Sequence, residues 1–446
     1  FFPKSSHSKL NRANDPLFDQ CSNDYCHQYY INGSPKAGDI YTGTSWMTIL
    51  ICGLREGGES YFALDITHGK PFGETKGNGY LWEFTESELG LSWSEPSIER
   101  IKNGTGAEWG AFFGSGYDMA EQNGKEAYLY GIVAHDKAPL WNNGSNDINR
   151  IKISSSDLKD DALSSPLIAD LDADYRGDRI YVGNLYGTMY RVVDIGKGEH
   201  PKISKLFYFG HTSHINPVRA KAAYAYAVDD GSIWIYFGTG RYEAQSDKMC
   251  GIQQYFLGLK ETKGTLPAYS LDDLATLHIR KMEYMNTETG EIQQVKAIEG
   301  ENDLRKSWAL LLEASPVLTV SERIIEQPLI VAGKVFFSTF IPDRNICSGK
   351  GETWLYALEY ETGLPPVTPV FDLNKDGVCD EEDMIVDMQG KKHNIAGIYV
   401  GTGPGSRPVL YKDELFITTT DKNLVALKVN LPESRTAVTS WRDCTI

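Results

Sequence analysis

The chain has 446 residues, of which 41% are hydrophobic and 23% charged, so it can bury a sizeable core and is not a disordered protein. It carries 44 lysine and arginine residues against 60 aspartate and glutamate residues, a formal net charge of −16. A surface this acidic repels phosphate backbones, so we expect no nucleic-acid partner. No window of about 18 uninterrupted apolar residues occurs, and we therefore expect no membrane-spanning helix.

Alternating apolar and aromatic runs, joined by glycine-rich turns, recur along the chain and predict β-strands. The clearest runs lie at 61–67, 180–191, 233–240, 354–359, 414–420 and 424–427. Their spacing exceeds the about 40 to 50 residues of compact propeller blades, which indicates long inserts between strands. Repeated strand hairpins of this kind predict an all-β fold, either a propeller or a sandwich. The run at 354–359, followed by Thr362 and Gly363, resembles the blade motif of quinoprotein-type propellers, and this resemblance favours the propeller.

Helix is expected in only two short segments. Ser270 can cap a helix over 271–281, with Asp272 and Asp273 near its N-terminal end, and a second helix is predicted over 156–163. No proline-rich or otherwise extended linker divides the chain. We therefore expect a single domain over 1–446.

Cysteine is sparse and odd in number, with seven residues spread along the chain. Cys21 and Cys26, followed by His27, are predicted to form a local disulfide; a haem-attachment motif would have two residues between the cysteines instead of four. The odd thiol is either free, as at Cys379, or paired outside this sequence. His211 and His214 have no acidic or cysteine neighbour at ligand spacing, and a polar loop is expected there.

The first acidic loop spans 170–178 and places oxygen ligands at calcium-ligand spacing. Carboxylates stand at positions 1, 3, 5 and 9, and a backbone carbonyl at position 7; these are Asp170, Asp172, Asp174, Asp178 and, for the carbonyl, Arg176. Carboxylates this close repel one another unless a cation neutralises them. Tyr175 stands where a glycine is usual, so the turn is expected to be made differently. The alternative is a polar turn whose aspartates cap backbone amides.

The second acidic loop spans 372–383 and matches the pattern of an EF-hand calcium loop more fully. Oxygen side chains fall at positions 1, 3, 5, 9 and 12, a carbonyl at position 7 and glycine at position 6; the predicted ligands are Asp372, Asn374, Asp376, Val378, Asp380 and Asp383. Asp383 departs from the pattern, because a glutamate at position 12 reaches further. The alternative is a solvated acidic turn.

Six ordered motifs cover nearly the whole chain. They read YYINGSP (29–35), GGESYFALDIT (57–67), WGAFFGSGY (109–117), SPLIADLD (165–172), YFGTGRY (236–242) and VFFSTFIP (335–342). In this order they resemble the C-terminal domain of the PilY/PilC family of type IV pilus tip-associated adhesin and biogenesis proteins.

The resemblance implies a quinoprotein-like β-propeller of seven modified blades, with long inserts and a few short helices. It also implies that the sequence begins inside the first blade, with leading strands and any N-terminal adhesin region upstream. The loop at 170–178 occupies the place where the family carries an aspartate-rich calcium loop. Ca²⁺ is therefore the expected cofactor.

The same resemblance implies a non-enzymatic protein that acts in pilus biogenesis, in control of retraction and twitching motility, and in surface adhesion. It implies minor pilins of the pilus-tip complex as partners, possible host-cell or abiotic ligands, and export across the outer membrane to the pilus tip. Two alternatives stay open. A pyrroloquinoline quinone dehydrogenase would carry adjacent cysteines over the cofactor, which this chain lacks; a pilus-independent adhesin would share the fold without the pilus partner.

Overall fold

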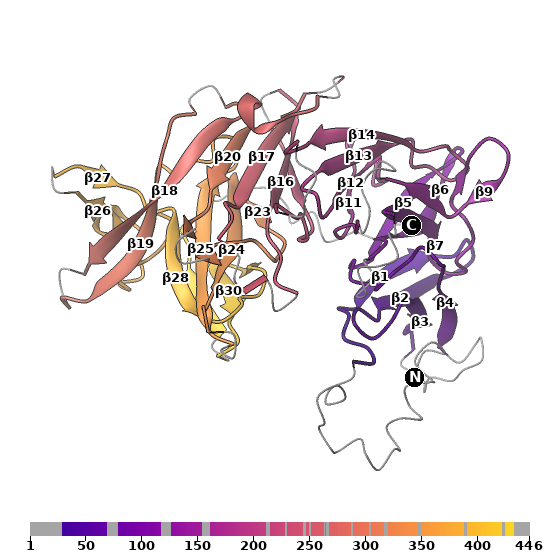
Figure 1. Cartoon of the computed structure of the whole chain (residues 1–446), viewed down its shortest axis with the longest axis horizontal. Helices are drawn as coiled ribbons and strands as arrows, with labels where there is room; N and C mark the ends of the chain where they lie inside the picture. Colours follow the sequence, from indigo (N-terminus) through magenta and orange to yellow (C-terminus); the bar gives the residue numbers. More distant parts are fainter. Residues whose placement is uncertain are drawn as a thin grey trace, which may run out of the picture. The chain divides into compact units, whose positions relative to one another are not determined.

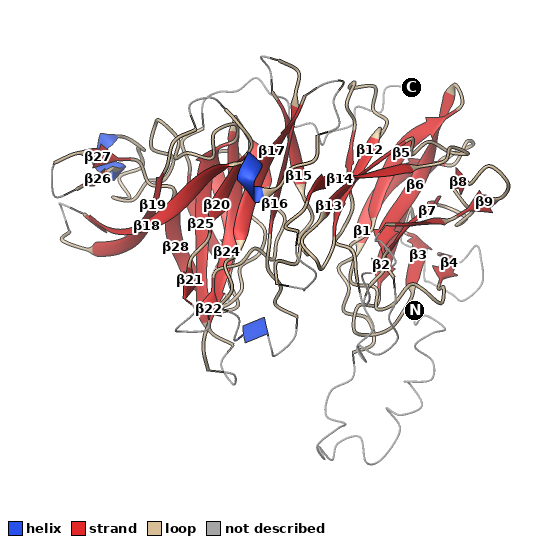
Figure 2. Ribbon diagram, turned by 45° about the horizontal axis from the view of Figure 1, so that its top comes forward, coloured by secondary structure: helices blue, strands red, loops and turns tan. Residues whose placement is uncertain are grey.

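The computed structural model describes residues 29–68, 79–116, 126–153, 161–210, 215–227, 230–243, 247–248, 251–262, 264, 267–286, 289–302, 305–315, 320–345, 349–387, 390–421 and 424–431. Strands dominate these residues, as Figure 2 shows, which confirms the all-β prediction. None of the described helices is long and apolar enough to cross a membrane. The predicted Cys21–Cys26 disulfide and the His211–His214 loop lie outside the described residues. Cys52 and Cys379 lie within them and are free thiols.

The chain divides into two compact units, Phe1–Lys221 and Ala222–Ile446. The first unit contains three four-stranded antiparallel sheets, drawn in indigo to magenta in Figure 1. Their strands, in spatial order, are β1 (Lys36–Tyr41), β2 (Trp46–Gly53), β3 (Tyr61–Asp65) and β4 (Tyr80–Phe84); β5 (Ser97–Asn103), β6 (Gly106–Gly114), β7 (Tyr128–Val133) and β10 (Arg150–Lys152); and β11 (Leu167–Ala169), β12 (Arg179–Gly183), β13 (Met189–Val193) and β14 (Lys202–Phe207). A small hairpin pairs β8 (Trp141–Asn142) with β9 (Asp147–Ile148).

Side-chain alternation along β6 explains how these sheets pack. Successive residues of a strand point to opposite faces, so Phe112 and Phe113 enter different cores. Phe113 packs in the cluster with Tyr61 and Tyr130, its ring centroid 4.1 Å from that of Tyr61, whereas Phe112 packs with Trp141 in the cluster that includes β12 and β13. The middle sheet therefore contributes to two cores, as a propeller blade does with its two neighbours.

The second unit contains a ten-stranded sheet and a three-stranded sheet. The larger sheet consists of two four-stranded groups joined by a long hairpin. The first group is β15 (Ala223–Tyr226), β16 (Ile233–Gly238), β17 (Tyr255–Glu261) and β20 (Trp308–Leu311); the hairpin is β18 (Ala275–Met285) and β19 (Ile292–Glu299); the second group is β28 (Gly397–Thr402), β25 (Gly351–Glu359), β24 (Lys334–Pro342) and β23 (Leu329–Val331). The smaller sheet is β29 (Val409–Tyr411), β30 (Glu414–Thr418) and β31 (Leu424–Lys428).

The hairpin joins the outer strands of the two groups. β18 pairs in parallel with β20, and β19 pairs in antiparallel fashion with β28. Two further small hairpins, β21 (Ala314–Ser315) with β22 (Val320–Ser321) and β26 (Ile385–Val386) with β27 (Lys392–His393), extend from this unit. The described residues thus form six blade-like sheets or groups. The count of seven blades and the single domain over 1–446 stay predictions.

A buried ion pair fastens the hairpin to its neighbours. Lys296 of β19 and Glu322, which follows β22, are both fully buried, and their Nζ and Oε1 atoms lie 2.9 Å apart. Oε1 of Glu322 also accepts hydrogen bonds from the hydroxyls of Thr339 and Tyr356. The Lys296 ammonium lies 4.1 Å from the ring centroid of Trp354, which adds a cation–π contact.

The predicted helix over 271–281 is wrong. Ser270 and Asp273 do form a capping box, but the helix is a single 3₁₀ turn, η3 (Leu271–Asp273), after which the chain enters β18. From Ala275 onward the residues alternate between faces with a period of two, and pairing on both sides of β18 favours the strand. The predicted helix at 156–163 lies mostly outside the described residues; its last residue, Leu163, forms a β-bridge with Asn184.

Candidate metal-binding loops

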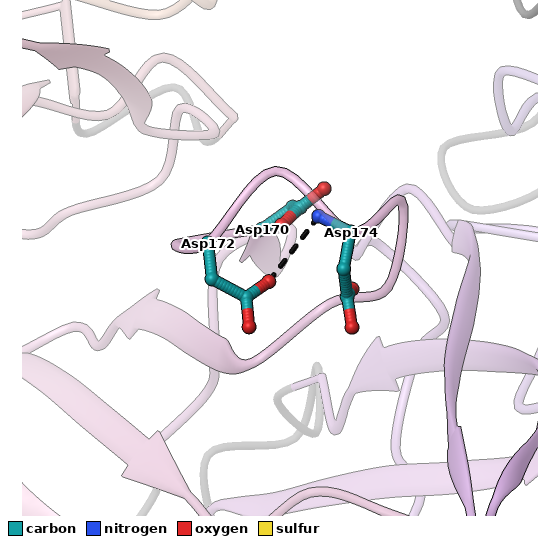
Figure 3. Close-up of side chains that lie close together, drawn as sticks. All are labelled: Asp170, Asp172 and Asp174. Atoms are coloured by element: carbon teal, nitrogen blue, oxygen red, sulfur yellow. Dashed lines mark hydrogen bonds between the residues drawn. The ribbon is translucent and has the colours of Figure 1, made fainter.

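The first acidic loop joins β11 to β12 and brings together three of its predicted ligands. One carboxylate oxygen from each of Asp170, Asp172 and Asp174 lies within 4.8 Å of the others. Figure 3 shows the three side chains around one turn, with the bond that the Asp174 amide donates to the Asp172 carboxylate. Asp178 lies at the end of the loop, where its Oδ2 accepts from the Leu171 amide at 2.6 Å.

The hydrogen bonds of this loop curl the backbone around its carboxylates. Oδ2 of Asp170 accepts from the amide of Tyr175 at 2.8 Å, and Oδ1 of Asp174 accepts from the amide of Arg176 at 2.9 Å. The guanidinium of Arg176 returns to Asp174, so the pKa of that carboxyl lies below its usual range. The loop is thus ordered by bonds from amides to carboxylates, an arrangement that both the calcium loop and the polar turn predict.

The second acidic loop has the same internal bonds. It lies between β25 and β26, and Oδ2 of Asp372 accepts from the amide of Gly377 at 2.9 Å. Oδ1 of Asn374 accepts from the amide of Asp376 at 3.0 Å, and Oδ1 of Asp376 accepts from the amide of Val378 at 2.7 Å. Position by position, these bonds repeat those of the first loop, so the two segments share one backbone fold.

The last carboxylate of each loop makes the same contact from a different position. Asp383, at position 12, is buried and accepts from the Leu373 amide at 2.7 Å, as Asp178 at position 9 accepts from Leu171. Asp383 also belongs to a capping box with Asp380 on the 3₁₀ turn η4 (Glu381–Asp383). Burial, together with neighbouring aspartates, raises the pKa of both Asp178 and Asp383. A bound cation would remove that penalty.

The expectation that Tyr175 forces a different turn is wrong. Tyr175 adopts a left-handed φ of 64°, close to the 89° of Gly377 at the same loop position, and Ala173 and Lys375 match at 62° and 65°. Gly177 is required for another reason: a Cβ there would lie 2.2 Å from a methyl of Ile168. The first loop therefore makes the same turn as the second, at the cost of strain in Tyr175.

Tyr175→Gly should relieve this strain. We expect the free energy of unfolding to rise by about 0.5–1 kcal/mol, because glycine enters the left-handed region freely and this gain exceeds its extra entropy in the unfolded chain. Tyr175 is 72% exposed, so little packing is lost. Guanidinium denaturation of the variant and of Tyr208→Gly, a residue with negative φ, measures the effect; a less stable Tyr175→Gly protein would contradict the strain.

Each loop retains a buried carboxylate oxygen without a hydrogen-bond partner. These are Oδ1 of Asp170 and Oδ1 of Asp372, the first residue of either loop. A buried, unpaired carboxylate oxygen is costly and suits a hard cation such as Ca²⁺, which takes six to eight oxygen ligands. The predicted ligands of both loops are all oxygen atoms, which fit this ion. The carbonyls of Arg176 and Val378 stay predicted ligands.

Residues distant in sequence hold the second loop from outside. The Tyr284 hydroxyl donates to the carbonyl of Glu382 at 3.1 Å, and the Asn286 amide donates to the carbonyl of Asn374 at 3.3 Å. Lys428 of β31 donates to the carbonyl of Gly377 at 2.7 Å. These contacts were not predicted, because no local spacing in the sequence signals them.

Comparisons with known proteins agree with the resemblance. A family model described as the PilY1 beta-propeller domain matches residues 6–271. The chain is 26% identical over 356 residues to a type IV pilus biogenesis factor PilY1 homolog of Xylella fastidiosa, covering 76% of this chain and 23% of that protein. It is 26% identical over 411 residues to the type IV pilus biogenesis factor PilY1 of Pseudomonas aeruginosa PAO1, covering 83% of this chain and 33% of that protein.

A solved structure has the same fold. The crystal structure of the Pseudomonas aeruginosa PilY1 C-terminal domain superposes with a TM-score of 0.73 at 21% identity, covering 96% of this chain and 87% of that one. The chain matches 23% of the length of the Xylella protein and 33% of the length of the Pseudomonas protein, so it spans about a quarter to a third of these relatives.

Proposed function

We propose a role in type IV pilus biogenesis for this chain, which belongs to the PilY1 β-propeller family. The observation that carries the proposal is the family match over most of the first unit and beyond, together with relatives that are named as pilus biogenesis factors. The propeller would bind minor pilins of the pilus-tip complex at the bacterial surface. In that position it would contribute to control of retraction, to twitching motility and to adhesion.

Calcium is the cofactor that we propose for both acidic loops. One ion would be held by the first loop, through Asp170, Asp172, Asp174, Asp178 and the carbonyl of Arg176. The other would be held by the second loop, through Asp372, Asn374, Asp376, Asp380, Asp383 and the carbonyl of Val378. The support is the shared loop geometry and the unpaired Oδ1 atoms of Asp170 and Asp372. The ion would neutralise clustered carboxylates and so stabilise the loops between strands.

A non-enzymatic role is favoured over a quinone-dependent dehydrogenase. The sequence has no adjacent cysteine pair of the kind that such enzymes place over the cofactor. Reconstitution with the quinone and calcium, followed by a dye-linked alcohol oxidation assay, separates the two. A pilus-independent adhesin is separated by pull-down with minor pilins from the same genome, which such a protein would not retain.

Calcium should stabilise the folded chain by mass action. At a free concentration about 100-fold above the dissociation constant, one site adds about 2.7 kcal/mol to the free energy of unfolding, because the ion binds the folded loops alone. Isothermal titration of the metal-free chain measures the binding. Asp174→Ala and Asp376→Ala should each remove one site, and Asp272→Ala, an exposed aspartate outside the loops, should remove none.

Unchanged calcium binding in the Asp174→Ala/Asp376→Ala double variant would overturn the assignment of the ion to these loops. The pilus role is tested separately, in the source bacterium. Deletion of the gene should reduce surface piliation and twitching, and the full-length protein should restore them. Normal piliation in the deletion strain would contradict the role in biogenesis, whatever the calcium result.

A further inference from the structure

A cluster of two arginines around one tryptophan lies in the first unit, away from the acidic loops. The Arg55 guanidinium carbon lies 4.2 Å from the ring centroid of Trp93, and that of Arg219 lies 5.9 Å from the same ring. All three side chains are half-buried. We call Arg55, Trp93 and Arg219 the arginine–tryptophan cluster.

The chain places Arg55 at this position by backbone bonds to one serine. The Ser92 hydroxyl accepts from the amides of Leu54 and Arg55 at 2.7 and 3.2 Å and donates to the carbonyl of Gly58 at 3.1 Å. Arg55 and Ser92 also form an isolated β-bridge. Arg55 has a left-handed φ of 52°, a conformation that costs energy for any residue except glycine. The fold therefore holds the Arg55 side chain over Trp93 against local strain.

The Arg55 guanidinium lacks an anionic partner among the described residues. Its Nε is buried and has no hydrogen-bond acceptor. Several other arginines among the described residues do have a carboxylate partner, as Arg150 has Glu86 at 2.6 Å and Arg241 has Asp247 at 3.0 Å. The chain has 60 acidic residues, yet none of the described ones pairs with the half-buried Arg55, so its guanidinium is available to an anionic ligand.

The charge and shape of the cluster select the ligand. A guanidinium is a planar fork that binds carboxylate or phosphate in a bidentate manner. Arg219 donates to the carbonyl of Leu163 at 3.2 Å, and its positive charge already stabilises the ionised form of the buried Asp161 carboxyl, so Arg55 is the guanidinium left to neutralise a ligand. One positive charge matches a carboxylate better than a phosphate group, which carries about −1.5 to −2. The net charge of −16 also repels an acidic tract but tolerates a single acidic side chain.

We propose that Arg55 and Trp93 form a binding site for one glutamate or aspartate side chain of a partner polypeptide. The carboxylate binds the Arg55 guanidinium, and the aliphatic stem of the acidic side chain packs on the Trp93 indole. The site lies at the beginning of β5 and β11, where Ser97 donates to the Pro166 carbonyl at 2.7 Å, whereas the acidic loop follows the end of β11. It is therefore separate from the calcium loops and independent of the ion.

Fluorine NMR of the full chain labelled with 5-fluorotryptophan tests the proposal. Trp93→Phe assigns the Trp93 resonance among those of the nine tryptophans. The probes are acetyl-Gly-Glu-Gly-amide, its glutamine counterpart, a phosphoserine counterpart, and sodium acetate. We expect the glutamate peptide alone to shift the Trp93 resonance saturably, with a dissociation constant of roughly 1–10 mM for one bidentate contact.

Variants identify the residue that binds the probe. Arg55→Gln should abolish the shift, Arg55→Lys should weaken binding several-fold because the fork is lost, and Arg305→Gln, an exposed arginine already paired with Glu361, should change nothing. Unaltered resonances of the other tryptophans show that each variant is folded. A saturable shift that survives in Arg55→Gln, stronger binding of the phosphoserine peptide, equal binding of acetate, or no shift with the glutamate peptide would each overturn the proposal.

Discussion

Glu322→Gln should lower the free energy of unfolding by about 3 kcal/mol, because the buried Lys296 ammonium loses its nearer carboxylate, at 2.9 Å, and keeps only the partly exposed Glu313 at 3.5 Å. The side chains of Lys296 and Glu322 are completely inaccessible to solvent. Burial alone would raise the pKa of the Glu322 carboxyl, but the Lys296 charge and hydrogen bonds from Thr339, Lys296 and the Glu313 amide hold it below its usual range. Glu322 is therefore ionised in the folded chain.

The location of the Lys296–Glu322 pair determines which strands are loosened when it is broken. Lys296 lies on β19, whereas Glu322 contacts Tyr356 of β25 and Thr339 of β24. The pair thus connects the β18–β19 hairpin to the second four-stranded group of the large sheet. We expect the loss of stability to be accompanied by faster amide hydrogen exchange in β18 and β19, since local opening follows the loss of local contacts.

Guanidinium denaturation and hydrogen exchange of matched variants measure these effects. Arg280→Gln removes an exposed pair on the same hairpin, with Glu299 at 3.0 Å, and should change stability by no more than about 0.5 kcal/mol. The double variant Lys296→Met/Glu322→Gln should be more stable than Glu322→Gln alone, because no buried charge remains unpaired. A Glu322→Gln protein as stable as the wild type would contradict the fastening role.

The strands were predictable where side-chain alternation is local. The runs at 180–191 and 354–359 became β12, β13 and β25 because apolar and aromatic residues there alternate and turn at glycines. A helix was predicted over 271–281 because a serine cap followed by two aspartates is typical of a helix start. The segment forms a strand from Ala275 onward because it pairs with β19 and β20. Local propensity is a weak guide where long-range pairing competes.

The acidic loops were predictable for the same reason. Their residues are consecutive, so the turn of each loop follows from local spacing, and in the first loop three carboxylate oxygens lie within 4.8 Å of one another. Their outer contacts, from Tyr284, Asn286 and Lys428, come from other strands and have no local signature. The same is true of the Lys296–Glu322 pair and of the arginine–tryptophan cluster. Sequence spacing thus predicts turns made within one loop and misses contacts made where strands meet.

Asp161 should make the chain less stable as the pH rises from about 4 to about 7. This carboxyl is completely buried, and burial raises its pKa from 3.8 to about 7, against opposing hydrogen bonds from Asn184 and from the amides of Leu185 and Ala162. In the unfolded chain the group ionises near its ordinary pKa, so over this range the folded state binds more protons than the unfolded state. Raising the pH therefore favours unfolding until the pH exceeds the folded pKa.

The size of the effect follows from the shift. A difference of about three pKa units corresponds to about 4 kcal/mol of stability lost between the two pH values, with a plateau above about pH 7. Denaturation curves measured from pH 4 to 8 should show this slope in the wild type and a much flatter one in Asp161→Asn, which cannot ionise. Asp413→Asn, at an exposed position, should keep the wild-type slope. If Asp161→Asn keeps the wild-type slope, another group binds the extra proton and the prediction is wrong. If stability instead rises with pH over this range in both proteins, the raised pKa of Asp161 is contradicted.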